Sequence, residues 1–218
     1  MDSIKQAVEL ARATDAPAPE LLRADPVDPN IRDIRLDAAH LEQSRIVAHA
    51  TAKEHGRYYD MLRTQVLQEM DKKSWQFLAV TSPTPACGKT VTACNLAMSI
   101  ARLPERSVLL VDLDLGKPTV ASYLGIENSR GVMDLLEARA PISSVVNQVS
   151  IGPTNFMVLP GTRPSSSSSE WMASQTMGTL LQTIKREFRS RIVIFDLPPM
   201  LLGDDVISIL PRMDATLL

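Results

Sequence analysis

The fold is decided by one stretch of sequence, QFLAVTSPTPACGKT at residues 76–90. Residues 76–80 have the composition of a short buried strand, and a helical pattern runs from Lys89 to about Ala101. The Gly-Lys-Thr tripeptide that ends the stretch therefore stands between a strand and a helix. This context predicts a P-loop, in which backbone N–H groups and a helix N-terminus face a β-phosphate, whereas the tripeptide alone is also found at helix starts without a ligand.

The chemistry of a triphosphate assigns roles within this loop. Lys89 is expected to bridge the β- and γ-phosphates, and the hydroxyl of Thr90 is expected to bind Mg²⁺. Only the tail of the motif is standard, because Pro83 stands where the general pattern has its first glycine. The residues expected to contact the nucleotide are Pro85, Ala86, Cys87, Gly88, Lys89, Thr90 and Val91.

Three aspartates follow apolar runs farther along the chain. Asp112 and Asp114 come after residues 107–111, and Asp196 follows residues 191–195 in a Walker-B-like pattern. Isolated strand-end aspartates also occur in ordinary turns. In open α/β sheets, however, ligands bind at the carboxyl ends of strands, so these side chains are expected at the same edge as the P-loop.

Together with Lys89 and Thr90, the three carboxylates predict a complete cage for ATP and Mg²⁺. The expected metal ligands are Thr90, Asp114 and Asp196.

The alternation of strand and helix patterns predicts the overall architecture. It indicates an α/β P-loop NTPase fold with a mostly parallel sheet and helices on both faces. Ser169 is expected to cap one of the helices. The expected strands lie at 76–80, 107–111, 155–159 and 191–195, and the expected helices at 89–101, 133–139, 170–189 and 205–210.

The N-terminal part has a different composition. A short capped amphipathic helix is expected at residues 3–11, followed by a proline-rich flexible linker at 14–30. One or two further helices are expected between 40 and 70. We therefore divide the chain into an N-terminal segment, 1–39, and a nucleotide-binding domain, 40–218. Because residues 214–218 read as the opening of another buried strand, we expect the chain to be truncated there.

The totals of the 218-residue chain exclude some classes of partner. A net charge of −2 and a pI near 5.9 give no general basic surface, so no nucleic-acid partner and only indirect membrane contact are expected. Two cysteines without metal-type spacing fit a reducing compartment. With no long apolar span and no signal peptide, a cytoplasmic protein is expected.

An ordered set of motifs gives a family resemblance over about Tyr59 to Leu218. The sequence resembles the bacterial tyrosine kinases of capsule and exopolysaccharide systems, whose domain belongs with the deviant-Walker ATPases of the MinD and ParA type. The matching pieces are Leu62-Arg63-Thr64, Thr81-Ser82-Pro83, Gly88-Lys89-Thr90, Val111-Asp112-Leu113-Asp114 with Pro118, Leu159-Pro160-Gly161, Ser169-Glu170, and Asp196-Leu197-Pro198-Pro199 with Asp205.

The resemblance implies an ATP-dependent protein-tyrosine autokinase that regulates exopolysaccharide synthesis or export. Lys89, Asp112 and Asp114 are the implied catalytic residues, with one aspartate assisting the attacking tyrosine hydroxyl and the other Mg²⁺. The implied partner is a separate transmembrane activator, a polysaccharide co-polymerase, which recruits the chain to the inner face of the plasma membrane. Homo-oligomers are also implied.

The sequence departs from this family in several places. Ala86 and Cys87 replace a glycine and an acidic residue, and Gly116-Lys117 interrupts the usual Asp-x-Arg-x-Pro segment. The helix that forms rings in the family has two of its three charges reversed, at positions matching Arg57, Asp60 and Arg63.

The family's tyrosine-rich tail is also missing. The chain has three tyrosines, Tyr58, Tyr59 and Tyr123, and we expect the first two to be packing residues rather than acceptors. Two alternatives stay open: a catalytically weak nucleotide-binding regulatory module, and a ParA/MinD-like switch ATPase. The switch class has an extra lysine early in the loop, and this chain has Thr84 at that position, which argues against the switch class.

Overall fold

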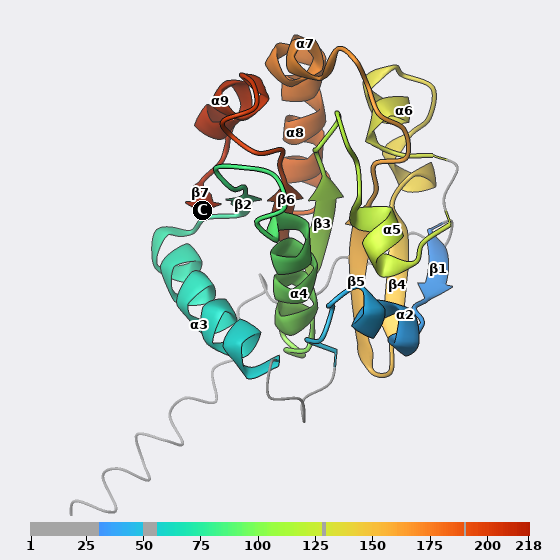
Figure 1. Cartoon of the computed structure of the whole chain (residues 1–218), viewed down its shortest axis with the longest axis vertical. Helices are drawn as coiled ribbons and strands as arrows, with labels where there is room; N and C mark the ends of the chain where they lie inside the picture. The colour runs from blue at the N-terminus through green and yellow to red at the C-terminus, as the bar shows by residue number, and fades with distance from the viewer. Residues whose placement is uncertain (1–30, 50–55, 128–129, 190) are drawn as a thin grey trace, which may run out of the picture.

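The structure is a computed structural model that describes residues 31–49, 56–127, 130–189 and 191–218. Within these ranges a seven-stranded sheet has the order β1-β4-β5-β3-β6-β2-β7 (Figure 1). All four expected strands are confirmed, with ends shifted by one residue. The strands are β1 (Arg32–Arg35), β2 (Phe77–Val80), β3 (Val108–Asp112), β4 (Asn147–Ile151), β5 (Thr154–Leu159), β6 (Ile192–Asp196) and β7 (Ala215–Leu217).

The sheet is mostly parallel, as expected. Among the described pairs, β4 and β5 run antiparallel and the others run parallel. β2, β3 and β6 are buried along their whole length, which is typical of a sheet covered on both faces. Because β2, β3 and β6 are neighbours and parallel, the loops at their carboxyl ends meet at one edge.

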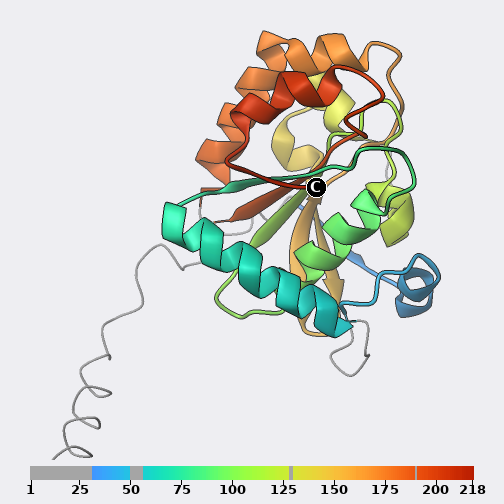
Figure 2. The same ribbon diagram turned by 60° about the vertical axis from the view of Figure 1, so that its left-hand side comes forward.

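Helices cover both faces of the sheet, as predicted (Figure 2). One apolar core joins the sheet to α2, α3, α4 and α5, and a second core joins its other face to α6, α7, α8 and α9. The helices are α2 (Ala38–Gln43), α3 (Gly56–Lys73), α4 (Lys89–Ala101), α5 (Val120–Leu124), α6 (Val132–Leu136), α7 (Ser168–Ala173), α8 (Gln175–Glu187) and α9 (Asp205–Ile209), with 3₁₀ turns η2 (Ile142–Ser144) and η3 (Leu210–Arg212).

The first strand of the sheet was not predicted. β1 pairs in parallel with β4, and Leu36 and Leu41 just after it are buried against the sheet. The boundary predicted between residues 39 and 40 therefore falls after a strand of the domain. The helix and linker expected at 3–11 and 14–30 lie outside the described residues.

The helix expected at residues 170–189 is wrong in detail, because it is two helices. Ser174 breaks it: the Ser174 hydroxyl donates to Trp171 O at 2.7 Å and accepts from Met177 N at 3.0 Å, which caps α8. Ser169 is not the cap of α7, because that helix already begins at Ser168.

The strand expected at residues 214–218 is confirmed by β7, which pairs with β2 over residues 215–217, but none of the three residues is buried. Across the described ranges, none of the helices combines the length and the apolar composition needed to cross a membrane.

Candidate functional site

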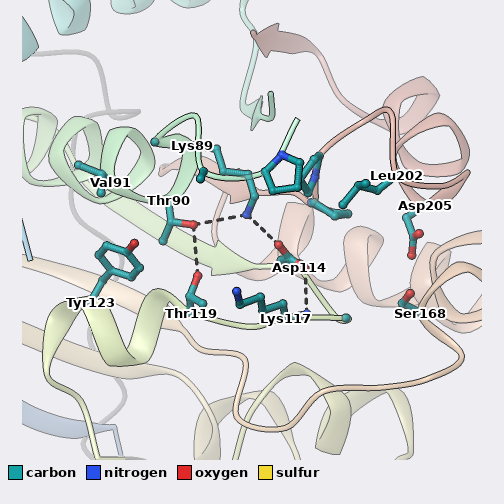
Figure 3. Close-up of a pocket in the computed structure, with 16 residues that line it drawn as sticks. Lys89, Thr90, Val91, Asp114, Lys117, Thr119, Tyr123, Ser168, Leu202 and Asp205 are labelled. Atoms are coloured by element: carbon teal, nitrogen blue, oxygen red, sulfur yellow. Dashed lines mark hydrogen bonds and ion pairs between the residues drawn. The ribbon is translucent and has the colours of Figure 1, made fainter. Parts of the chain in front are cut away.

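A cavity of about 510 Å³ lies where the P-loop meets the carboxyl ends of β3 and β6 (Figure 3). The P-loop and the first residues of α4 form one wall, and the loop from β3 to α5 forms the facing wall. Residues from the loop after β6, together with Ser168 of α7 and Asp205 of α9, complete it.

The backbone of the P-loop suits an anion. Gly88 has φ +87°, in the left-handed region, and caps α4 without a side-chain hydrogen bond to its first N–H groups. A Cβ at Gly88 would meet nothing within 4 Å, so the residue is required by its backbone angle rather than by space. The first turn of α4 therefore opens on the cavity with N–H groups that no side chain of its cap occupies.

Lys89 lies among the carboxylates. Its ammonium is 2.8 Å from Asp114 Oδ2 and 3.6 Å from Asp196 Oδ1. Burial favours loss of the proton, but the charges of Asp196 and Asp114 outweigh it and raise the pKa of Lys89 above its usual value. The side chain is therefore a cation at neutral pH.

Thr90 and Asp196 connect α4 to β6. The Thr90 hydroxyl donates to Asp196 Oδ2 at 2.6 Å and lies 3.3 Å from the hydroxyl of Thr119. Burial raises the pKa of Asp196 to about 6, although the nearby Lys89 charge lowers it. Asp196 Oδ1 is buried without a hydrogen-bond partner, as expected of an oxygen that can accept from water bound to Mg²⁺.

Asp112 is fully buried and does not line the cavity. Its Oδ2 accepts the N–H groups of Thr119 and Val120 at 2.9 Å each, and its Oδ1 accepts that of Asp114 at 3.2 Å. Burial, with the charge of Asp196 on the next strand, raises the pKa of Asp112 to about 7. Asp112 thus holds the β3–α5 loop, and its predicted catalytic role stays a prediction.

The predicted cage for ATP and Mg²⁺ stays a prediction: Asp114 and Asp196 lie together at Lys89, while Asp112 binds backbone N–H groups. The part of the chain that the structure describes contains no group of three His, Cys, Asp or Glu side chains arranged to hold a metal ion. A Mg²⁺ ion at Thr90 and Asp196 would complete its shell with phosphate oxygens and water, which is its usual preference.

Most of the expected nucleotide contacts line the cavity, and Cys87 does not. Cys87 is exposed, with its sulfur 3.2 Å from Thr84 Oγ1. The expected residues that do line it are Pro85, Ala86, Gly88, Lys89, Thr90 and Val91.

The residues of the facing wall were largely not predicted from the sequence. Lys117, Thr119 and Tyr123 all line the cavity, and none was assigned a role at the site. Their closeness in sequence to Asp114 is the signal that could have found them, because a loop that follows a strand-end carboxylate continues around the same site.

The two tyrosines of α3 differ. Tyr59 is half-buried against the core, so its predicted packing role is confirmed. Tyr58 is 65% exposed, and the same prediction is wrong for it.

Several known proteins resemble this chain. The putative tyrosine-protein kinase EpsB of Ralstonia nicotianae is 31% identical over 72% of the chain and 20% of EpsB. The tyrosine-protein kinase CpsD of Streptococcus pneumoniae is 28% identical over 76% of the chain and 70% of CpsD. The chain thus spans about a fifth of EpsB. The kinase domain of Escherichia coli tyrosine kinase ETK has the same fold, with TM-score 0.70 and 22% identity over 85% of this chain and 74% of that one.

A family match covers the P-loop, both strand-end carboxylate motifs and the sheet between them. Residues 78–211 match the CbiA family, described as the CobQ/CobB/MinD/ParA nucleotide binding domain. The match agrees with the mostly parallel sheet and with the loop that opens α4 on the cavity. The chain therefore belongs to the CobQ/CobB/MinD/ParA nucleotide binding domain family, and its relatives EpsB and CpsD carry the name of tyrosine-protein kinases.

Proposed function

We propose that this chain is an ATP-dependent protein-tyrosine autokinase domain that serves exopolysaccharide synthesis or export. One observation carries the proposal: Lys89, Thr90, Asp114 and Asp196 converge within hydrogen-bond or ion-pair distance beside one cavity at the carboxyl edge of the sheet. The names of the relatives support tyrosine as the acceptor.

The residues fit Mg·ATP. The first N–H groups of α4 bind the β-phosphate, and the Lys89 ammonium neutralises charge between the β- and γ-phosphates. Thr90 and Asp196 would hold Mg²⁺, directly or through water, and the bound ion would supply positive charge to the phosphate oxygens. When the phosphates enter, Lys89 exchanges part of its contact with Asp114 for them.

The transfer step requires one carboxylate free to take a proton. The tyrosine oxygen attacks the γ-phosphorus, the bond from that phosphorus to the β–γ bridging oxygen breaks, and ADP leaves. Asp114 lines the cavity and accepts the phenol proton once Lys89 turns to the phosphates. Asp112 acts by fixing the loop that carries Asp114, through the three N–H bonds that it accepts.

The exposed Tyr58 is an acceptor only in trans. The neighbouring Asp60 carboxylate contacts Ser99, which is ten residues along α4 from Lys89, or about 15 Å at 1.5 Å per residue. Tyr58 therefore lies far from the phosphate end of its own α4, and a second copy must phosphorylate it. A transmembrane activator that gathers copies at the inner face of the plasma membrane would raise this rate by raising their local concentration.

One observation favours a second candidate, a regulatory module that binds nucleotide with little turnover. Ala86 in the P-loop has φ +62°, a conformation that costs a residue with a Cβ about 1 kcal/mol. Strain in the loop that must hold the phosphates would weaken binding or slow transfer.

The test is incubation of purified protein with γ-labelled ATP and Mg²⁺, with and without the cytoplasmic part of a candidate activator. Phosphotyrosine and ADP are measured together. Phosphotyrosine that is lost in Lys89→Met and kept in Lys72→Met, an exposed lysine at the end of α3, supports the kinase. Formation of ADP without phosphotyrosine would support a switch ATPase. Nucleotide binding without either product would support the regulatory module.

A further inference from the structure

A second lysine lines the cavity. Figure 3 shows Lys117 along the β3–α5 wall, while Lys89 enters from the P-loop, with Asp114 between them in this view. The two lysines differ in their partners: Lys89 is paired with Asp114 and Asp196, whereas the ammonium of Lys117 has no ion-pair partner among the described residues.

The backbone holds Lys117 in place. Its N–H donates to the side-chain Oδ1 of Asp114 at 3.0 Å and lies 3.1 Å from the Asp114 carbonyl oxygen. Two residues later, the N–H of Thr119 is bound by Asp112. Pro118, which follows Lys117, disfavours helical backbone at Lys117. With the loop fixed on both sides, the base of the side chain stays on the cavity wall while its exposed ammonium is free to meet a ligand.

The position of this wall relative to the P-loop indicates which phosphate it faces. The first turn of α4 takes the β-phosphate, and an ion held by Thr90 and Asp196 would supply positive charge beside the phosphates. Because the β3–α5 loop lines the cavity across from the P-loop, with Thr119 3.3 Å from Thr90, the γ-phosphate extends from the P-loop toward that loop. A diphosphate has no group at that point.

We infer that Lys117 contacts the γ-phosphate and makes the site prefer a nucleoside triphosphate over a diphosphate. The inference rests on the proposed function, because it takes the cavity as the ATP site. Lys117 supplies a positive charge from the wall opposite Lys89, and that charge acts mainly on the γ-phosphate because the interaction weakens with distance. It also loses its phosphate partner when the γ-phosphoryl group leaves, which favours release of ADP.

The experiment compares the Kd of ATP with the Kd of ADP, both with Mg²⁺, by calorimetry on the full chain. Lys117→Ala is expected to raise the Kd of ATP about fivefold and the Kd of ADP less than twofold. The effect on ATP is the size expected for a partly exposed charge pair. Lys117→Arg is expected to retain the wild-type ratio. Lys72→Ala, an exposed lysine outside the cavity, is the matched control and should change neither constant.

The outcomes separate the inference from the function on which it rests. Equal weakening of ATP and ADP in Lys117→Ala, or no weakening of either, overturns the role of Lys117 while wild-type ATP binding and phosphotyrosine still support the kinase. A wild-type chain that binds neither nucleotide overturns both. Since Lys117 is exposed, its alanine variant is expected to fold, and an unchanged Tm confirms that binding rather than folding is compared.

Discussion

The ammonium of Lys89 lies 2.8 Å from Asp114 and 3.6 Å from Asp196, so one cation holds together two carboxylates from the ends of β3 and β6. Removing a partner of a buried pair leaves the other charges uncompensated. Lys89→Met is therefore expected to lower the free energy of unfolding by about 3 kcal/mol at pH 8, measured in urea without nucleotide. The loss should shrink at pH 5, because Asp196 has a pKa of about 6 and is then protonated. Wild-type stability of Lys89→Met at pH 8, with Lys72→Met as control, would contradict the pairing.

Asp112 predicts a pH dependence of stability with a definite sign. Its pKa is about 7 in the folded chain and about 4 in an unfolded one, so the folded state binds the proton more tightly. Stability from this group is therefore present below the unfolded pKa and is lost as pH rises toward 7. Asp112→Asn removes the charge and keeps an oxygen for the N–H groups of the loop. The Tm of the variant relative to wild type should rise between pH 5 and pH 8, without nucleotide or metal.

The control for this prediction is Asp71→Asn, at an aspartate whose side chain is 48% exposed. The Tm of Asp71→Asn relative to wild type should not rise between pH 5 and pH 8. A flat difference between Asp112→Asn and wild type from pH 5 to pH 8 would mean that Asp112 is charged throughout, despite its burial.

The sequence predicted the central strands and the P-loop well, because both depend on local patterns. Apolar runs that end in aspartate are buried strands, and the helix expected at 89–101 is observed with the same ends. β1 and β4, at one edge of the sheet, escaped prediction because their composition is weak. β1, with sequence RDIR, is largely exposed and becomes a strand only through its pairing with β4.

The sequence predicted which residues form the candidate site more accurately than it predicted how they are arranged. Spacing along the chain placed Lys89, Thr90, Asp114 and Asp196 at one edge, which the structure brings together. It could not tell that Asp112 binds backbone N–H groups of its own loop, because residues two apart in an extended segment lie on the same face and the pattern predicts the same direction for Asp112 and Asp114. That distinction depends on the path from Gly116 to Val120, which no local pattern specifies.

Ala86 offers a test of strain in the P-loop. Its φ of +62° suits glycine better than a residue with a Cβ. Ala86→Gly removes the strain but adds freedom to the unfolded chain, so a net gain of about 0.5 kcal/mol, or a rise in Tm of 1–2 °C, is expected. Ala101→Gly, in the last turn of α4, is the matched control and should lower the Tm by a similar amount. Equal losses in both variants would show that the backbone at Ala86 is not strained.

The charges of α3 are used within the chain. The Asp60 carboxylate accepts from the Ser99 hydroxyl at 2.6 Å, from Arg63 at 3.2 Å and from Arg102 at 3.0 Å, which fastens α3 to α4. Two of the three positions that match the family's ring-forming charges are thus Asp60 and Arg63, both engaged inside one subunit. Of the three positions, Arg57 is therefore the charge that is exposed to a neighbouring copy.

Asp60→Ala is expected to lower the free energy of unfolding by about 1–2 kcal/mol, because a carboxylate 26% exposed loses four hydrogen bonds, one from Ser99, one from Arg63 and two from Arg102. Asp71→Ala is the matched control on the same helix. Asp71 pairs with Arg106 at 2.7 Å but its side chain is 48% exposed, so its loss should cost less than about 0.5 kcal/mol. Urea unfolding and light scattering on both variants measure stability and oligomeric state together. If Asp60→Ala changes the oligomeric state and leaves stability at the wild-type value, the carboxylate serves a contact between copies rather than the link between α3 and α4.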